Sequence, residues 1–157
     1  MEHLSVAIAD DNQKILDMLG EIISTDKDLD LVGKAKNGEE MCQIIRERQP
    51  DVVLLDLIMP KMDGLTVMDQ MNRSQAGEKR PYFIVVTAVG QERITEDAFN
   101  KGANYYIMKP FNNDMLLDRI KSVRRTARNT EKKEEEKSVS GARPGSLENR
   151  VTNMLHE

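Results

Sequence analysis

The sequence predicts an α/β fold in which five parallel strands form one doubly wound sheet with helices on both faces. Short apolar runs alternate along the chain with segments whose apolar residues recur at helical spacing, and the connections between them are short. The apolar run Val52–Leu55 is too short for a free-standing helix. A strand of successive apolar residues is typical of a parallel sheet that is buried on both faces.

The first half of the chain supplies three expected strands and two expected helices. Leu4–Ala9 is the first strand, and an apolar stripe at helical spacing follows it. Leu31–Ala35 is a weaker strand. The dipeptide Asn37-Gly38 then opens a helix that stops before Pro50, and Val52–Leu55 is the third strand. The stripe of the first helix consists of Ile15, Leu16, Leu19, Ile22 and Ile23.

The second half continues the same alternation. Apolar residues within 65–71 indicate a third helix, and Phe83–Thr87 is the fourth strand. Ile94–Phe99 is a short helix closed by Gly102, and Tyr105–Met108 is the fifth strand. The last helix has a stripe of four apolar residues, Met115, Leu116, Ile120 and Val123.

Composition places the chain among ordinary intracellular proteins. Its 157 residues are enough for one domain with a real core plus an appendage. The net charge of −4 gives no sign of a nucleic-acid footprint over the whole chain. A single cysteine, Cys42, forms no internal bridge, and its helical context favours a small buried hydrophobe over a reactive thiol. No signal peptide or long apolar span opens the chain, so we expect a cytoplasmic protein without a membrane partner.

The composition changes near residue 128, and this change divides the chain into three parts. We expect the α/β domain at residues 1–127 and a charged, solvated linker at residues 128–145. Ser146 is a suitable N-cap for a helix within residues 146–157, but so short a helix is unstable alone in water. We interpret it as the start of a further C-terminal domain; packing on the first domain or pairing with another chain is the alternative.

Polar side chains follow four of the predicted strands, and they suggest chemistry at one edge of the sheet. Asp10 and Asp11 follow the first strand, and Asp56 follows the third. Thr87 ends the fourth strand, and Lys109 follows the fifth. The carboxyl ends of parallel strands form the edge where α/β sheets bind ligands. An aspartate after a strand ordinarily caps the next turn, but this convergence favours a site around Asp56.

These residues resemble the signature motifs of the response-regulator receiver domain. The motifs are Asp10-Asp11, D-L-I-M-P-K-M-D-G at 56–64, T-A at 87–88 and K-P-F at 109–111. Each motif is weak alone, but the ordered set is specific, and the resemblance covers roughly residues 1–127. It implies the flavodoxin-like receiver fold with strand order 2-1-3-4-5.

The resemblance assigns a role to each residue of the predicted site. Asp56 is the implied phosphoacceptor, a nucleophilic carboxylate that becomes an aspartyl phosphate. Asp11, Asp56 and the main-chain carbonyl of Ile58 are implied ligands of Mg²⁺, or of Mn²⁺ or Ca²⁺, and Asp10 would act partly through water. The cation would neutralise oxygens of the transferring group. Lys109 is the implied counter-charge; its alternative role is a salt bridge to one of the acidic residues.

Thr87 and Tyr106 are the implied switch pair. A hydroxyl at the end of the fourth strand reaches a new phosphoryl oxygen only by moving, and its movement frees space for an aromatic side chain. Without the resemblance, Tyr106 would be read as an ordinary core or surface aromatic. If the strand is regular, Tyr105 and Tyr106 point to opposite faces, one inward and one outward. Pro110 makes a cis peptide bond after Lys109 possible.

The resemblance also implies partners and an output. The phosphoryl donor would be a histidine kinase or histidine phosphotransferase that docks on Asn12–Ile22 and the loop near Pro110. Phosphorylation would produce a homodimer or release an effector domain through the face made by the fourth helix, fifth strand and fifth helix. The linker and residues 146–157 resemble those of the sporulation master regulators of the stage 0 sporulation protein A type, so a DNA-binding effector domain and sporulation control are expected.

Three other functions compete with a transcription factor of this kind. A flavodoxin-like nucleotide or flavin binder needs a cradle of main-chain amides after the first strand, where this chain has Asp-Asp-Asn. An aspartyl phosphatase needs a general acid two residues after its nucleophile, and Ile58 cannot serve. We therefore expect a signalling phosphoacceptor rather than an enzyme. A stand-alone phosphorelay carrier without an output domain remains the alternative.

Overall fold

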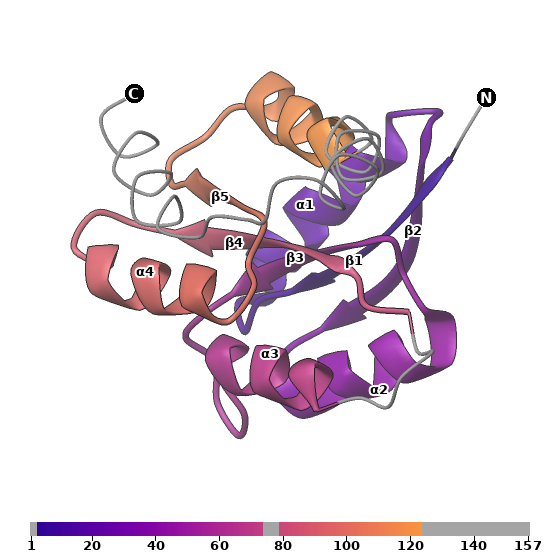
Figure 1. Ribbon diagram of the computed structural model, residues 1–157. Coiled ribbons are helices and arrows are strands. Elements are labelled where there is room, and N and C mark those ends of the chain that lie inside the picture. Colours follow the sequence, from indigo (N-terminus) through magenta and orange to yellow (C-terminus); the bar gives the residue numbers. More distant parts are fainter. Residues whose placement is uncertain (1–2, 74–78, 124–157) are drawn as a thin grey trace, which may run out of the picture.

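The computed structural model describes residues 3–73 and 79–123, which form the predicted five-stranded parallel sheet (Figure 1). The strand order is β2-β1-β3-β4-β5, and every neighbouring pair of strands is parallel. Both the fold class and the strand order predicted from the sequence are therefore confirmed. The strands are β1 (Leu4–Ala9), β2 (Leu29–Ala35), β3 (Val52–Asp56), β4 (Tyr82–Thr87) and β5 (Tyr105–Met108).

Helices cover both faces of this sheet (Figure 1). α1 and the helical residues 113–123 lie on one face, and α2, α3 and α4 lie on the other. The alternation of side chains along each strand supplies a separate core to each face. Val6, Ile8, Val52 and Leu54 belong to the core under α1, whereas their neighbours in sequence belong to the opposite core. The helices are α1 (Gln13–Ser24), α2 (Gly38–Arg48), α3 (Gly64–Asn72) and α4 (Glu92–Asn100).

Three of these helices begin at a polar residue that caps them. Asn12 accepts hydrogen bonds from the main-chain N–H groups of Lys14 and Ile15 at the start of α1. Asn37 and Asp63 do the same for α2 and α3, each with one N–H group. Such side chains satisfy donors that the first turn of a helix leaves unpaired. Asn12 directly follows the two acidic residues after β1, so α1 begins immediately after them.

The structure corrects some details of the sequence prediction. β2 begins at Leu29 rather than Leu31, because Leu29 and Asp30 continue the ladder against the start of β1. Met115 belongs to the predicted apolar stripe of the last helix, but 49% of it is exposed. The other three members of that stripe are buried, so Met115 lies at its margin. Tyr105 is only partly exposed, because both faces of the sheet are covered; Tyr106 is buried on the opposite face.

Two further expectations concern the chain as a whole. Cys42 is buried, as expected, and burial raises the pKa of its thiol. No helix within residues 3–73 and 79–123 is both long and apolar enough to span a membrane. The predicted linker at 128–145 and the predicted domain start at 146–157 lie outside the described residues.

Candidate functional site

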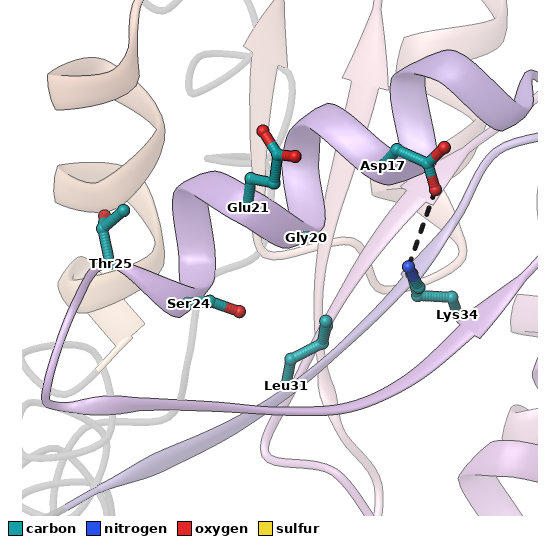
Figure 2. Close-up of a pocket in the computed structure, with 7 residues that line it drawn as sticks. All are labelled: Asp17, Gly20, Glu21, Ser24, Thr25, Leu31 and Lys34. Atoms are coloured by element: carbon teal, nitrogen blue, oxygen red, sulfur yellow. Dashed lines mark ion pairs between the residues drawn. The ribbon is translucent and has the colours of Figure 1, made fainter.

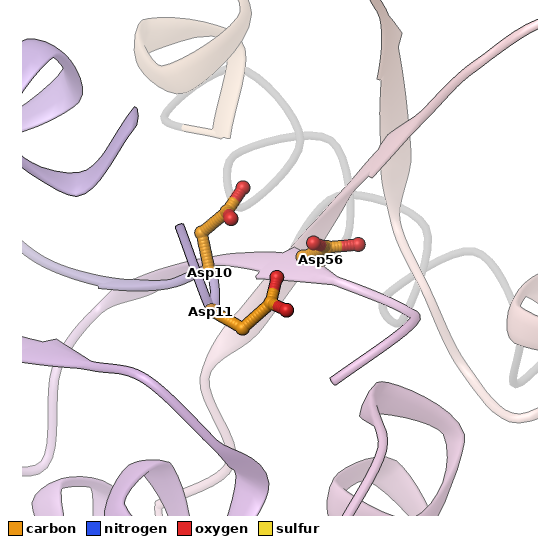
Figure 3. Close-up of side chains that lie close together, drawn as sticks. All are labelled: Asp10, Asp11 and Asp56. Atoms are coloured by element: carbon orange, nitrogen blue, oxygen red, sulfur yellow. The ribbon is translucent and has the colours of Figure 1, made fainter. Parts of the chain in front are cut away.

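Three carboxylates meet at the carboxyl-terminal edge of the two central strands. Ala9 pairs with Leu55 across β1 and β3, so the residues that follow them, Asp10 and Asp56, emerge side by side. One oxygen from each of Asp10, Asp11 and Asp56 lies within 4.8 Å of the others (Figure 3). Asp10 is buried, Asp56 is partly buried and Asp11 is exposed. The sequence prediction that these side chains come together is confirmed by this geometry.

Lys109 is the cation that reaches this acidic cluster. Its Nζ lies 3.5 Å from Oδ2 of Asp10, whose other oxygen accepts a hydrogen bond of 2.9 Å from the N–H of Asn12. The main-chain N–H of Lys109 donates to the carbonyl of Thr87 at 2.8 Å, which fixes the end of β5 beside β4. The Lys109–Pro110 peptide bond is cis. In this structure Lys109 therefore has the salt bridge that was its alternative role.

The environment of Asp56 disfavours its charged form. Burial is the largest cause, and it raises the pKa of this carboxyl group; the charges of Asp10 and Asp11 raise it further. A hydrogen bond of 3.1 Å from the N–H of Ile58 and the charge of Lys109 lower it. The resulting pKa is about 6. An additional positive charge beside Asp56 would therefore stabilise its ionised form.

The loop after Asp56 is held close to it by a glycine. The N–H of Gly64 donates to the carbonyl of Leu57 at 3.0 Å, and a Cβ atom on Gly64 would lie 2.7 Å from the carbonyl oxygen of Asp56. Only a residue without a side chain permits so close an approach. Within the same loop, the carbonyl of Pro60 accepts a hydrogen bond of 2.7 Å from Met62. Pro60 and Gly64 thus shape the loop that follows Asp56.

The donor atoms of the cluster suit Mg²⁺ or a similar hard cation. All three side chains offer carboxylate oxygens, and Mg²⁺ prefers oxygen ligands. Within residues 3–73 and 79–123, the ion pair formed by these three carboxylates is that of Asp10 with Lys109, so the cluster has negative charge left to bind a cation. Asp10, Asp11 and Asp56 would hold the ion. The assignment of the Ile58 carbonyl as a further ligand stays a prediction.

Thr87 ends β4 at the same edge, but its hydroxyl group faces α4. The alternation along β3 and β4 places the side chain of Thr87 on the face opposite to that of Asp56. Its Oγ1 lies 2.7 Å from Oγ1 of Thr95 and 3.3 Å from Oε1 of Gln91. The structure therefore brings the main chain of Thr87 to the acidic edge and turns its hydroxyl group away from it.

Tyr106, the other member of the predicted switch pair, is in the core on the α4 side of the sheet. Only 7% of it is exposed, and its ring packs edge-on against Phe99 with the ring centroids 6.3 Å apart. The switch pair is thus buried against one helix. The role of this pair as a switch stays a prediction.

Sequence reasoning missed three residues that position this site. Asn12 binds Asp10, and an asparagine before an apolar helical stripe is a recognised capping signal that could have revealed it. Gln91 and Thr95 bind Thr87. Their spacing of four residues on one helix places them on the same face, but only the packing of α4 shows that this face meets Thr87.

A groove elsewhere on the surface contains none of the predicted site residues (Figure 2). It lies between α1 and β2 and has a volume of about 590 Å³. Asp17 and Lys34 form an ion pair of 3.7 Å across it. The groove is lined by Asp17, Gly20, Glu21, Ser24, Thr25, Leu31 and Lys34.

Comparison with known protein families assigns the chain to one family. The family model of the response regulator receiver domain matches residues 6–121. The chain belongs to this family. Receiver domains are the phosphorylated parts of two-component response regulators; aspartate phosphorylation, Mg²⁺ binding and transfer from kinases are general in the family. The prediction of a receiver domain of a two-component response regulator is confirmed.

Solved structures of receivers resemble the chain over about three quarters of its length. A putative response regulator from Chloroflexus aurantiacus is 27% identical, with a TM-score of 0.69, covering 78% of this chain and 98% of that one. The CheX–CheY–BeF3–Mg²⁺ complex from Borrelia burgdorferi includes a chain that is 31% identical, with a TM-score of 0.67, covering 76% and 88%. A DNA-binding response regulator of the LuxR family from Staphylococcus aureus is 26% identical, with a TM-score of 0.69, covering 76% and 98%.

Proposed function

We propose that Asp56 is the phosphoacceptor of this receiver and that Asp10, Asp11, Asp56 and the main-chain carbonyl of Ile58 bind the Mg²⁺ that transfer requires. The proposal rests on one observation: three carboxylates lie within 4.8 Å of one another at the carboxyl edge of the sheet, beside the ammonium group of Lys109. The pKa of the Asp56 carboxyl group is raised to about 6, mainly by burial. Perturbed carboxyl groups of this kind are common at functional sites.

The chemistry is a transfer of one phosphoryl group to Asp56. A lone pair of the Asp56 carboxylate forms the new O–P bond, and the P–N bond of a phosphohistidine donor breaks with its electron pair on the imidazole nitrogen. The ammonium group of Lys109 offers positive charge to the incoming phosphoryl oxygens. When bound, Mg²⁺ would supply further charge neutralisation. The chain acts here as a signalling phosphoacceptor in its own phosphorylation and dephosphorylation, not as an enzyme with a separate substrate.

Phosphorylation by a small-molecule donor tests this proposal. The chain is incubated with acetyl phosphate and Mg²⁺, and the intact mass is measured; we expect an added mass of about 80 Da. Asp56→Asn should abolish the adduct, and EDTA should prevent it. Asp51→Asn is the matched control, because Asp51 precedes the same strand at its other end. An adduct that persists in Asp56→Asn, or that forms equally in EDTA, would refute the assignment.

Thr87 and Tyr106 form the switch pair in this proposal. Both are buried against α4, so a movement of Thr87 toward a phosphoryl group on Asp56 changes the packing around Tyr106. We expect the altered surface of α4, β5 and the helix at 113–123 to favour a homodimer. Beryllofluoride with Mg²⁺ should raise the dimer content in sedimentation. A monomer that is unchanged at high protein concentration would argue against this output.

The donor in the cell would be a histidine kinase or a histidine phosphotransferase. We place its docking surface on α1 and on the loop that follows β5. Met18 on α1 and Met115 on the helix at 113–123 are 44% and 49% exposed, and both helices cover the same face of the sheet (Figure 1). Exposed methionines on neighbouring elements suit a partner helix. Charge substitution at Met18 should slow transfer from the kinase without slowing transfer from acetyl phosphate.

The output we propose is DNA binding by a C-terminal domain in a cytoplasmic transcription factor of the sporulation-control type. Two resemblances support this proposal. Residues 128–157 resemble the linker and domain start of sporulation regulators, and the receiver domain is similar to a regulator from Staphylococcus aureus that is described as DNA-binding. The sequence that follows Glu157 in the gene product tests this directly. A stop codon there would favour the alternative, a stand-alone phosphorelay carrier.

A further inference from the structure

Two buried threonines face each other between β4 and α4. Oγ1 of Thr87 lies 2.7 Å from Oγ1 of Thr95, and neither residue is more than 2% exposed. Thr95 also lies 2.7 Å from the carbonyl oxygen of Gln91, to which its hydroxyl group donates. A hydroxyl group has one proton. Since Thr95 uses its proton on Gln91, Thr95 must accept the hydrogen bond and Thr87 must donate it.

Gln91 strengthens this orientation of Thr87. It occupies the N-cap position of α4, but its side chain makes no capping hydrogen bond to the helix. Its Oε1 instead accepts a hydrogen bond of 3.0 Å from the N–H of Ala88 and lies 3.3 Å from Oγ1 of Thr87. The proton of Thr87 therefore has a near acceptor in Thr95 and a second, longer one in Gln91. Both acceptors belong to the start of α4.

The next turn of α4 contacts the other member of the switch pair. Phe99 is four residues after Thr95, so the two side chains share one face of the helix. The ring of Phe99 packs edge-on against Tyr106 at an interplanar angle of 81°. One face of α4 thus contacts both Thr87 and Tyr106.

We propose that Thr95 is a positioning residue that holds the hydroxyl group of Thr87 on the α4 side, in competition with a phosphoryl group on Asp56. The inference rests on the proposed function of Asp56 and Thr87 and adds a third residue that sets how readily the switch moves. Thr87 cannot give its single proton to Thr95 and to a phosphoryl oxygen at once. The Thr87–Thr95 hydrogen bond must therefore break before Thr87 can bind the phosphoryl group. Its free energy makes the change from the resting to the phosphorylated conformation less favourable by the same amount.

Thr95→Val removes the nearer of the two acceptors, at 2.7 Å rather than 3.3 Å, while keeping the shape of the side chain. In this variant the hydrogen bond from Thr95 to Gln91 is absent from both states of the switch, so its loss does not change the free-energy difference between them. The hydrogen bond from Thr87 to Thr95 exists only in the resting state, so its loss destabilises that state alone. Beryllofluoride with Mg²⁺ should then bind Thr95→Val about fivefold more tightly, the factor that one net hydrogen bond typically contributes. Without any ligand, the amide resonances of Ala88 and Tyr106 should shift toward their positions in the beryllofluoride complex.

Three variants separate positioning from a general loss of stability. Thr95→Ser keeps the hydroxyl group and should retain the original affinity. Thr25→Val also removes a hydroxyl group that donates to a helix carbonyl, that of Ile22 at 2.6 Å, but this hydroxyl group lies at the far end of α1. It should leave the affinity unchanged. In a Thr87→Ala background, Thr95→Val should have no effect on affinity, because the competing donor is gone.

The outcomes distinguish this inference from the function on which it rests. If the unaltered chain binds beryllofluoride and Thr95→Val binds it with equal or lower affinity, the inference is wrong and the proposed function stands. The inference is also overturned if Thr95→Val gains the same factor in the Thr87→Ala background. If the unaltered chain does not bind beryllofluoride with Mg²⁺, the proposed function fails and this inference fails with it.

Discussion

Two aspartates at opposite ends of one strand show how differently this fold treats the same side chain. Asp51 precedes β3, and its carboxylate accepts hydrogen bonds from the N–H of Ser5 at 2.8 Å and the hydroxyl group of Ser5 at 3.1 Å. Lys79 forms an ion pair with its other oxygen. Asp56 ends the same strand, accepts one hydrogen bond from the N–H of Ile58 and faces two further carboxylates.

The pKa values of the two groups move in opposite directions. Partial burial raises the pKa of Asp51, but the hydrogen bonds from Lys79 and Ser5 outweigh it and leave the pKa below its usual value. Burial also raises the pKa of Asp56, and there the opposing contacts are too few, so the pKa is about 6. One end of β3 is a completed structural contact. At the other end, the charged form of Asp56 is unfavourable, and a bound cation would stabilise it. Such locally destabilising groups are expected at functional sites.

Cation binding should give the largest difference between the two ends. At a free Mg²⁺ concentration one hundred times its Kd, the free energy of unfolding should rise by about 2.7 kcal/mol, because the ion binds only the folded chain. Urea unfolding with Mg²⁺ and with EDTA measures this. Asp51→Asn should keep the full gain, and Asp56→Asn should lose most of it. An equal gain in both variants would place the cation elsewhere.

Removing the charge at Asp56 should stabilise the metal-free chain at neutral pH. The pKa of Asp56 in the folded state, about 6, lies above the ordinary value of 3.8, so the folded state holds its proton more tightly and loses stability as the pH rises through 6. The full shift corresponds to about 3 kcal/mol, which solvent screening of this partly exposed group reduces to about 1–2 kcal/mol.

The pH dependence of this gain is its test. Urea unfolding in EDTA should show Asp56→Asn to be more stable than the unaltered chain at pH 7, and the difference should vanish below about pH 4, where both forms of the site are neutral. A variant that is less stable at pH 7 would mean that Asp56 is compensated as well as Asp51 is.

Asp51→Asn should have a smaller effect of opposite sign. It removes the charge that binds Lys79 and Ser5, and we expect a loss of about 1 kcal/mol because the ion pair is partly exposed. The pKa of Asp51 is lowered in the folded state, so its contribution is present at neutral pH and disappears as the pH falls through that lowered pKa. Urea unfolding at several pH values checks this, and a gain in stability at pH 7 would contradict it.

The sequence predicted the sheet and the acidic edge because both depend on local patterns. Apolar runs define the strands, and parallel pairing brings the residues after β1 and β3 together without further information. The contacts that orient these residues could not be predicted in this way. Ser5 and Asp51 are 46 residues apart, and their pairing depends on strand register. The direction of the Thr87 hydroxyl group depends on how α4 packs on the sheet. The exposure of Met115 depends on how the helix at 113–123 is rotated against the sheet.

The proposed function requires that the phosphoryl group is placed on Asp56 and on no other carboxylate. Acyl phosphates are reduced by borohydride, which converts a phosphorylated aspartate into homoserine and leaves free aspartates unchanged. The chain is treated with acetyl phosphate and Mg²⁺, reduced, digested and sequenced by mass spectrometry. We predict homoserine at position 56 and aspartate at positions 10, 11 and 51. Homoserine at any of those three positions, or at none of the four, would contradict the assignment of Asp56 as the phosphoacceptor.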